Sequence, residues 1–150
     1  INLHGGFRDQ TSHDYKGSDA LCIALQILNH LQDCREDFEL LNRVYLPLDI
    51  IKAHNVTLDH LIADEAPPEL RDCLNDILDY VDALIDTSQD FPSKLDNLWL
   101  GMESQIIINV AIQLSKKLRK YDPIKSRVKI SKLNYIRCFA SGSLKVLFRC

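Results

Sequence analysis

The sequence is poor in the two residues that most often form turns, since its 150 residues include only five glycines and five prolines. This scarcity argues against an all-β sandwich, whose short strands need frequent turns. The apolar residues are instead dominated by leucine and isoleucine, which favours long helices. A chain of this length holds one hydrophobic core and is too short for two ordinary domains. We therefore expect a single all-α domain over residues 1–150.

The chain also lacks an excess of positive charge, because its formal net charge is -3 and its pI is about 5.9. Proteins bind a nucleic-acid backbone by neutralising many phosphates, so nucleic acid is not an expected partner, although residues 116–132 are locally basic. No apolar run approaches the roughly 18 to 20 residues of a membrane span, and the first residues show no signal-peptide layout. Peripheral contact with a membrane is left open.

Cysteine pairs with metal-binding or disulfide-framework spacing are missing as well. The five cysteines are odd in number, widely spaced and without a CxxC pair. Neither a disulfide framework nor a zinc ribbon is therefore expected. We interpret the cysteines as reduced and mostly buried thiols of a cytoplasmic protein.

Helical periodicity organises the chain after an irregular opening segment. Residues 1–17 are polar, contain glycine and show no clear period, and the chain begins with isoleucine rather than methionine, which suggests the middle of a longer protein. Ser18 is the expected N-cap of the first helix, and Gly142 is a candidate weak point in the last. A proline at position 123 should end the helix before it. The predicted helices cover residues 18–39, from just after Pro68 to about 87, 98–120, and from about 131 onward, with one helical turn near 57–61.

The first predicted helix carries its polar side chains on a single stripe. On a wheel of about 100° per residue, the stripe is about 120° wide. Its members are Gln26, Asn29, His30, Asp33, Glu36 and Asp37. Only Gln32 and Arg35 interrupt the remaining apolar surface. A helix that is apolar around most of its circumference is buried, so we expect the stripe to face an internal cleft.

Asp33 and Asp37 stand four residues apart, on the same helix face, with Glu36 beside them. They lie at the C-terminal end of the helix, where the helix dipole disfavours each anion by a few tenths to about 1 kcal/mol. Hard oxygen donors suit Mg²⁺, which takes one or two carboxylates and completes its shell with water and phosphate oxygens. The alternative is ordinary ion pairing with Arg35, Arg43 or a lysine of another helix. Both interpretations require a compensating cation.

Two strings of residues resemble the squalene/phytoene synthase family. Residues 26–37 match QxxNxxxDxxxD, the family's second aspartate-rich motif, and residues 43–47 match the RxYLP that follows it. The spellings LNHLQDC and RVYLPLD, together with residues 122–132, are most similar to the hydroxysqualene synthase branch. The resemblance covers nearly all of the chain.

The resemblance implies an all-helical isoprenoid synthase fold, of which this chain is the C-terminal half of the helical bundle. In that fold two aspartate-rich motifs face each other across a cavity and bind a prenyl diphosphate through Mg²⁺. Asp33 and Asp37 are then the catalytic metal-binding pair, assisted by Gln26 and Asn29. The favoured branch converts presqualene diphosphate to hydroxysqualene without NADPH, whereas other members condense farnesyl diphosphate.

Further polar residues have two interpretations each. Arg43 and Tyr45 match the RxY of the family and either contact the phosphate region or form an ion pair and a packed loop aromatic. A polar line along the helix at 98–120 either faces the same cavity or is a solvated seam. That line consists of Gln105, Asn109 and Gln113.

The family's first aspartate-rich motif has no counterpart in the chain, because Asp9 and Asp14 lie in the irregular segment. One acidic motif supplies only part of the metal site. We therefore expect a prenyl diphosphate enzyme that works within a longer or two-chain protein, paired with a separate N-terminal half or as a homo-oligomer. A truncated, inactive family remnant and a helical interaction module are the alternatives.

Overall fold

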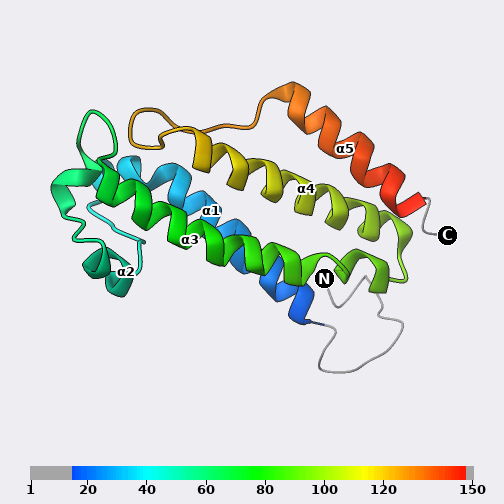
Figure 1. Ribbon diagram of the computed structural model, residues 1–150. Helices are drawn as coiled ribbons and strands as arrows, with labels where there is room; N and C mark the ends of the chain where they lie inside the picture. Colours follow the sequence, from blue (N-terminus) through cyan, green and yellow to red (C-terminus); the bar gives the residue numbers. More distant parts are fainter. Residues whose placement is uncertain (1–14, 148–150) are drawn as a thin grey trace.

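The structure is a computed structural model that describes residues 15–147. Its elements, shown in Figure 1, are α1 (Lys16–Leu41), α2 (Leu48–Ala53), η1 (Leu58–Leu61), α3 (Pro68–Ser88), η2 (Phe91–Lys94), α4 (Leu98–Lys120) and α5 (Lys132–Leu147). No β-strand occurs in this described range, so the all-α prediction is confirmed. The four predicted helices and the turn at η1 are confirmed too, whereas α2 and η2 were not predicted.

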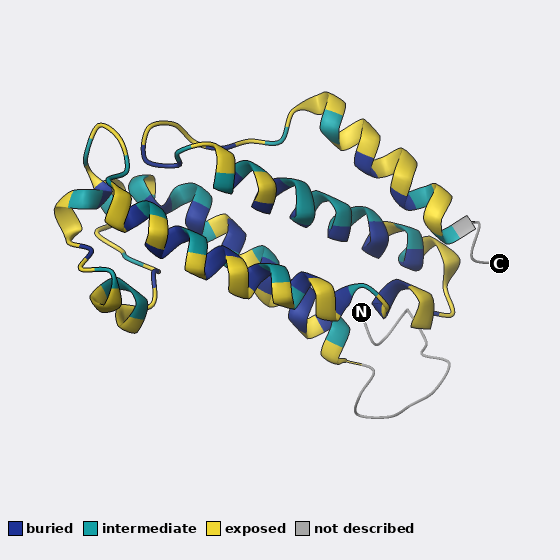
Figure 2. Cartoon of the chain, viewed as in Figure 1, coloured by how far each residue is buried: buried dark blue, intermediate teal, exposed yellow. Residues whose placement is uncertain are grey.

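The core lies between α1, α3 and α4, which run side by side along the molecule (Figure 1). Their facing sides are dark blue in Figure 2, and Leu28, Leu70, Val81 and Ile108 are completely or almost completely buried. Burying one such side chain contributes about 1.5 to 3 kcal/mol. The contact between α1, α3 and α4 therefore fixes the position of α1 in the molecule. No helix within residues 15–147 is long and apolar enough to cross a membrane.

The start of α1 corrects one prediction. Ser18 is not the N-cap, because α1 begins at Lys16 and Ser18 is buried inside its first turn. At Gly17 a Cβ atom would lie 2.7 Å from the Phe91 side chain, so the helix start sits directly against η2. Residues 1–14 of the predicted irregular segment lie outside the described range.

The ends of α4 follow from local chemistry. The Asn97 side chain accepts hydrogen bonds from the backbone N–H groups of Trp99 and Leu100, which caps the first turn. The helix ends at Lys120, before the proline at position 123. Both boundaries agree with the prediction.

Arg71 of α3 holds the C-terminal end of α4. Its guanidinium donates to the carbonyl oxygens of Leu118, Arg119 and Tyr121 at 3.3, 2.7 and 3.2 Å. The last carbonyl groups of a helix lack intrahelical donors, and positive charge is favourable there. The contact fixes the point at which the chain leaves α4.

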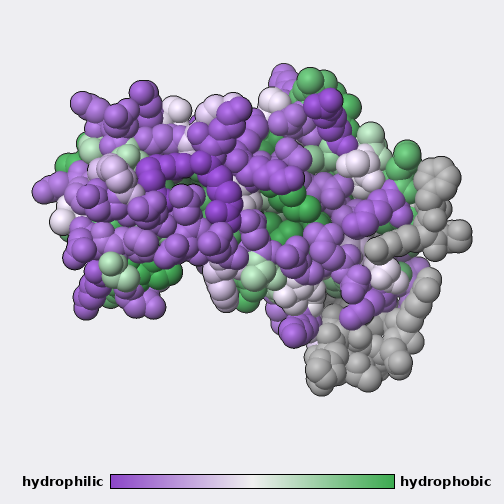
Figure 3. All heavy atoms as spheres, in the orientation of Figure 1, coloured by the Kyte–Doolittle hydropathy of each residue, from purple (hydrophilic) through white to green (hydrophobic). Residues whose placement is uncertain are grey.

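The last helix, α5, packs on α4 without a bend at Gly142. A Cβ at Gly142, which is buried, would lie 2.8 Å from Ile106 Cγ1 and 3.1 Å from the Ile106 backbone nitrogen. Asn109 of α4 also donates to Ser141 Oγ at 3.1 Å. The helix is unbroken at Gly142, and this glycine permits close approach of two helices. The outer side of α5 is mostly exposed, and hydrophobic atoms appear over it at the upper right of Figure 3.

The described cysteines agree with the prediction of reduced, mostly buried thiols. Cys34, Cys73 and Cys138 are buried, Cys22 is exposed, and none of these four forms a disulfide. Burial raises the pKa of Cys34 to about 12 and that of Cys73 to about 11. Both buried thiols are therefore protonated and unreactive at neutral pH.

Candidate metal and substrate site

The acidic end of α1 forms a shallow hollow with the connector between α4 and α5, residues 121–131. The hollow has a volume of about 200 Å³. It is lined by Asp33, Glu36, Asp37, Leu40, Leu41 and Arg127. Five of these residues come from one helix, and the connector contributes the arginine. The three carboxylates that periodicity placed on one face therefore share one surface depression.

Arg127 forms a forked ion pair with Asp33. Its Nε lies 2.8 Å from Oδ1, and its Nη2 donates to Oδ2 at 2.9 Å. Nη1 lies 3.9 Å from Glu36 Oε2. Only 15% of the Asp33 side chain is exposed. A compensating cation is thus present, but it is neither Arg35 nor Arg43, and sequence reasoning missed it. The only signal was the basic string at residues 122–132.

Two side chains of α1 fasten the connector that carries Arg127. Gln32 donates to the carbonyl oxygen of Val128, and Arg35 donates to that of Ile124 at 3.1 Å. Val128 and Ile124 are themselves buried against the core. The two polar residues that interrupt the apolar surface of α1 therefore hold the connector over the acidic end.

The acidic end remains short of positive charge. Burial raises the pKa of the Asp33 carboxyl, and the charges of Asp37 and Glu36 raise it further, whereas Arg127 lowers it. The net direction is upward. Burial has the largest effect on this pKa, so the shortage of positive charge rests on the lining itself: three carboxylates and one guanidinium leave a formal charge of -2, and an additional cation at this end would be favourable.

The chain reverses immediately after the acidic end. Asn42 adopts the left-handed conformation with φ of 50°, and the N–H of Arg43 donates to the carbonyl oxygen of Asp37 at 3.2 Å. Asparagine tolerates this conformation, which commonly ends helices. The turn brings Tyr45 onto the polar stripe, where its ring stacks on His30 with centroids 4.0 Å apart.

Arg43 and Tyr45 are linked to each other. Arg43 Nη1 donates to the Tyr45 hydroxyl at 3.3 Å, and this bond, with a smaller effect of the Asp37 charge, raises the pKa of the guanidinium. Both side chains are exposed. The structure therefore brings the RxY string beside the stripe, with the tyrosine stacked and the arginine in solvent.

The polar stripe does not face an internal cleft in the described chain. Gln26 and Asn29 are exposed and do not line the hollow around Asp33. Ile23, on the same helix, is also 44% exposed. Within residues 15–147, α3 and α4 cover one side of α1 and leave the stripe on the open side, because periodicity fixes which residues share a face and not which face neighbours cover.

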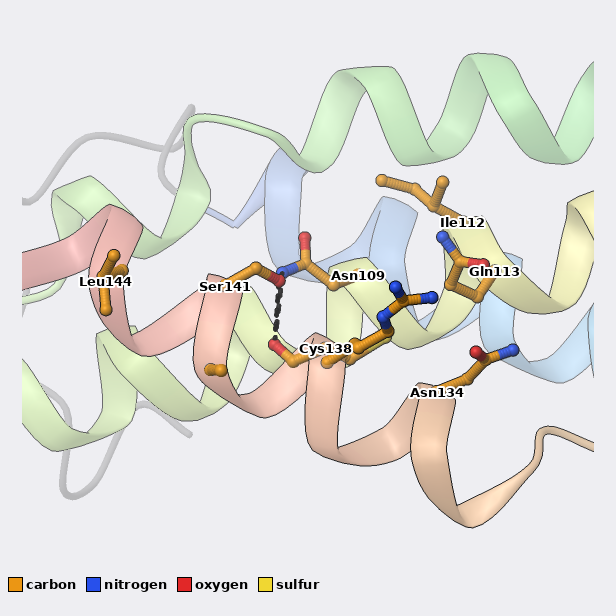
Figure 4. A pocket seen from close by; sticks show the side chains of 9 residues that line it. Asn109, Ile112, Gln113, Asn134, Cys138, Ser141 and Leu144 are labelled. Atoms are coloured by element: carbon orange, nitrogen blue, oxygen red, sulfur yellow. Dashed lines mark hydrogen bonds between the residues drawn. The ribbon is translucent and has the colours of Figure 1, made fainter.

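The polar line on α4 lies apart from the acidic hollow. Asn109 and Gln113 line a groove of about 530 Å³ between α4 and α5, in which Asn109 and Ser141 point toward each other (Figure 4). This groove and the hollow at Asp33 share no residue. Gln105 is fully buried and donates to Asn109, while its Oε1 accepts no hydrogen bond. Asn109 and Gln113 therefore lie in an open groove, as a solvated seam requires, whereas Gln105 is enclosed in the core.

The donor set suits a metal that is completed by substrate. Within residues 15–147, no group of three or more His, Cys, Asp or Glu side chains is arranged to hold a metal ion. Asp33 and Asp37 nevertheless present carboxylates from one helix face into one hollow. Mg²⁺ commonly binds through one or two carboxylates, with water and phosphate oxygens filling the remaining positions. The residues fit that mode of binding and not a protein cage.

Comparison with known proteins identifies the family. The model of the squalene/phytoene synthase family matches residues 2–134. The chain is 31% identical to a hydroxysqualene synthase of Rhodopseudomonas palustris, over 99% of this chain and 50% of that protein. It is 37% identical to a hydroxysqualene synthase of Zymomonas mobilis, over 74% of this chain and 37% of that protein.

A third relative has the same name as these two. The chain is 30% identical to a hydroxysqualene synthase of Sinorhizobium fredii, over 91% of this chain and 45% of that protein. The chain therefore belongs to the squalene/phytoene synthase family, and its helices have the all-α isoprenoid synthase fold of that family. It spans about half the length of the curated relatives it matches or less. No solved structure matches the chain.

Proposed function

We propose that this chain acts in isoprenoid biosynthesis as the part of a prenyl diphosphate enzyme that carries the second aspartate-rich motif. Asp33 and Asp37 would hold Mg²⁺ and, through it, the diphosphate of the substrate. The favoured reaction converts presqualene diphosphate to hydroxysqualene, since three relatives are hydroxysqualene synthases. Condensation of farnesyl diphosphate is the alternative reaction.

The charge of the hollow carries the proposal. Asp33, Glu36 and Asp37 with Arg127 give a formal charge of -2, because three carboxylates face one guanidinium. The raised pKa of Asp33 has the same cause in part. A divalent cation would neutralise this charge, and a bound Mg²⁺ would stabilise negative charge on a departing diphosphate. Arg127, released from Asp33, would remain on the connector to pair with phosphate oxygens.

The hollow also suits an amphiphilic ligand. Leu40 and Leu41 line it beside the carboxylates, and both are largely exposed. Charged and apolar side chains therefore meet at one point, as a diphosphate joined to a hydrocarbon chain requires. An apolar wall would also keep water from the carbocation until the proper capture step.

Four residues are proposed to contact the substrate or its metal-bound water. Gln26 and Asn29 present amide groups from the face of α1 that carries Asp33. Arg43 and Tyr45 lie beside that face and are joined by a hydrogen bond of 3.3 Å. Capture of the carbocation by water, with loss of a proton and of diphosphate, involves no reduction, so we expect no need for NADPH.

The partner half of the site is also proposed. The family's first aspartate-rich motif would come from an N-terminal half, in the same or a separate chain, or from another copy. We propose a cytoplasmic location on the basis of the sequence. A helical interaction module without catalysis is the second candidate, favoured by the forked pair in which Arg127 already engages Asp33.

A product assay tests the proposal. The chain is incubated with labelled presqualene diphosphate and Mg²⁺, alone and with an N-terminal family fragment that bears a helical DxxxD motif. Labelled hydroxysqualene, formed in the mixture and not by the N-terminal fragment alone, supports the assignment. If the mixture forms no product and calorimetry detects no Mg²⁺-dependent binding of farnesyl diphosphate, the interaction module is the better description.

A further inference from the structure

Asp122 lies where the chain leaves α4 and enters the connector. Its Oδ2 accepts the backbone N–H of Ala66 at 2.7 Å, and its Oδ1 accepts that of Ile124 at 2.8 Å. Aspartate commonly accepts the N–H two residues further on, which fixes a turn. The bond to Ala66 does something else, because it joins the connector to the loop before α3, residues 62–67, across 56 residues of sequence. One carboxylate therefore both shapes the start of the connector and anchors it.

Arg35 of α1 binds the same two segments. Its Nη1 donates to the carbonyl oxygens of Ala63 and Ile124 at 2.9 and 3.1 Å. The loop and the connector thus each donate an N–H to Asp122 and each accept a hydrogen bond from Arg35. Hydrogen bonds with one charged partner are roughly twice as strong as neutral ones. These two side chains join α1, the loop before α3 and the start of the connector at one point.

The connector carries Arg127 between this point and a second anchor. Beyond Arg127, Gln32 donates to the carbonyl oxygen of Val128. Lys117 donates to that of Lys129 at 2.9 Å. Between the two anchors a hollow of about 190 Å³ lies between the connector and α1, lined by residues of both. The Arg127 side chain is 46% exposed. A stretch with space beneath it and an exposed side chain depends on its two anchors for its position.

We propose that Asp122 is a positioning residue of the acidic hollow, which sets the place of Arg127 over Asp33 through the backbone of the connector. Asp122 itself lies outside the lining of that hollow. The forked pair needs Nε 2.8 Å from Oδ1 and Nη2 2.9 Å from Oδ2 at the same time. Such a two-point contact demands one orientation of the guanidinium, so a shift of the connector backbone breaks it. The place of Arg127 does not depend on the enzyme function.

Exchange of the Arg127 guanidinium protons with water tests this position without any ligand. In wild type the ion pair with Asp33 should slow exchange of the Nε–H, followed by nuclear magnetic resonance and assigned by its absence in Arg127→Lys. Asp122→Ala removes both acceptor oxygens and should speed this exchange about fivefold or more, because an ion pair is released. Asp122→Asn keeps one acceptor oxygen, so its rate should lie between the two. Asp64→Asn removes an exposed acid of the same loop, and this matched control should exchange as wild type does.

A double-mutant cycle tests the consequence for ligand binding, which rests on the proposed function. Calorimetry measures the binding of farnesyl diphosphate with Mg²⁺ to the whole chain. Asp122→Ala should weaken this binding roughly tenfold, because Arg127 no longer meets the phosphate oxygens. The same substitution should have no further effect in an Arg127→Gln background, because both substitutions act through one guanidinium.

The outcomes separate the two proposals. Unchanged exchange of the Arg127 Nε–H in Asp122→Ala overturns the positioning role, and so do losses of binding that simply add in the cycle, since these reflect a general loosening of the chain. If Asp122→Ala does not fold, as circular dichroism would show, the comparison of Asp122→Asn with Asp64→Asn decides in its place. If exchange accelerates although wild type binds no farnesyl diphosphate, Asp122 positions Arg127 and the proposed function fails. Faster exchange together with non-additive losses of binding supports both.

Discussion

Arg127 pairs with Asp33 across 94 residues of sequence, with Nε 2.8 Å from Oδ1 and Nη2 2.9 Å from Oδ2. The pair places positive charge at the C-terminal end of a helix, where the dipole disfavours carboxylates. It also joins the connector to the acidic motif that we propose as the diphosphate-binding site. Several measurable properties of the acidic end therefore depend on this one contact.

Arg127→Gln should raise the pKa of Asp33 further. Arg127 lowers that pKa. Once it is removed, burial and the charges of Asp37 and Glu36, which all raise the pKa, are no longer counteracted by its positive charge. Carboxyl ¹³C chemical shifts followed through a pH titration would report the change. Lys125→Gln, which removes only an exposed contact to Glu65, is the control and should leave the titration of Asp33 unaltered. A lower or unchanged value in the Arg127 variant would contradict the assigned cause.

Asp33→Asn should alter how stability depends on pH. The folded-state pKa of Asp33 is raised, so its contribution to stability is fully present below the ordinary pKa and is lost as pH rises through the raised value. Asparagine does not titrate. The free energy of unfolding of wild type should therefore fall relative to the variant across that window, measured by urea denaturation. An opposite slope would show that ion pairing with Arg127 outweighs burial.

Asp33→Asn combined with Asp37→Asn should abolish Mg²⁺-dependent binding of prenyl diphosphate and leave helicity intact. The proposed metal ligands are lost, while repulsion at the helix end is relieved. Calorimetry with Mg²⁺ and farnesyl diphosphate, with circular dichroism alongside, checks both parts. Asp72→Asn with Asp76→Asn is a matched control on α3, because these exposed acids have the same spacing. If the Asp33 and Asp37 variant bound Mg²⁺ and farnesyl diphosphate as wild type does, the polar stripe would have a structural role and not a metal-binding one.

Gly142→Val should loosen α5 from α4. The new side chain would meet the Ile106 backbone, which cannot move aside as a flexible side chain does, at a cost of roughly 1 to 3 kcal/mol. Faster hydrogen exchange in α5 than in α3 would reveal the loss. Ala140→Val introduces the same β-branched residue at an exposed position and should have a much smaller effect. An effect at Ala140 as large as that at Gly142 would contradict the packing cause, because by helix propensity alone valine is less favourable than alanine but more favourable than glycine.

Local sequence signals predicted most of the helices. They failed at positions whose structure is decided by packing against residues far away in the sequence. The bounds of α4 follow from Asn97 at its start and the proline after its end, both of which act within one helical turn. The start of α1 was missed, because Gly17 meets Phe91 of a distant segment. The packing role of Gly142 was missed for the same reason, since its neighbour is Ile106 of another helix.

By itself, the sequence determined the family motif and the sharing of one helix face by Asp33 and Asp37, because a helix has a fixed repeat of about 3.6 residues. Only the tertiary structure decided that Arg127 meets Asp33 and that α3 and α4 leave the polar stripe uncovered. It also decided that the apolar side of α5 points outward. These features depend on contacts between residues far apart in sequence, which no local repeat encodes.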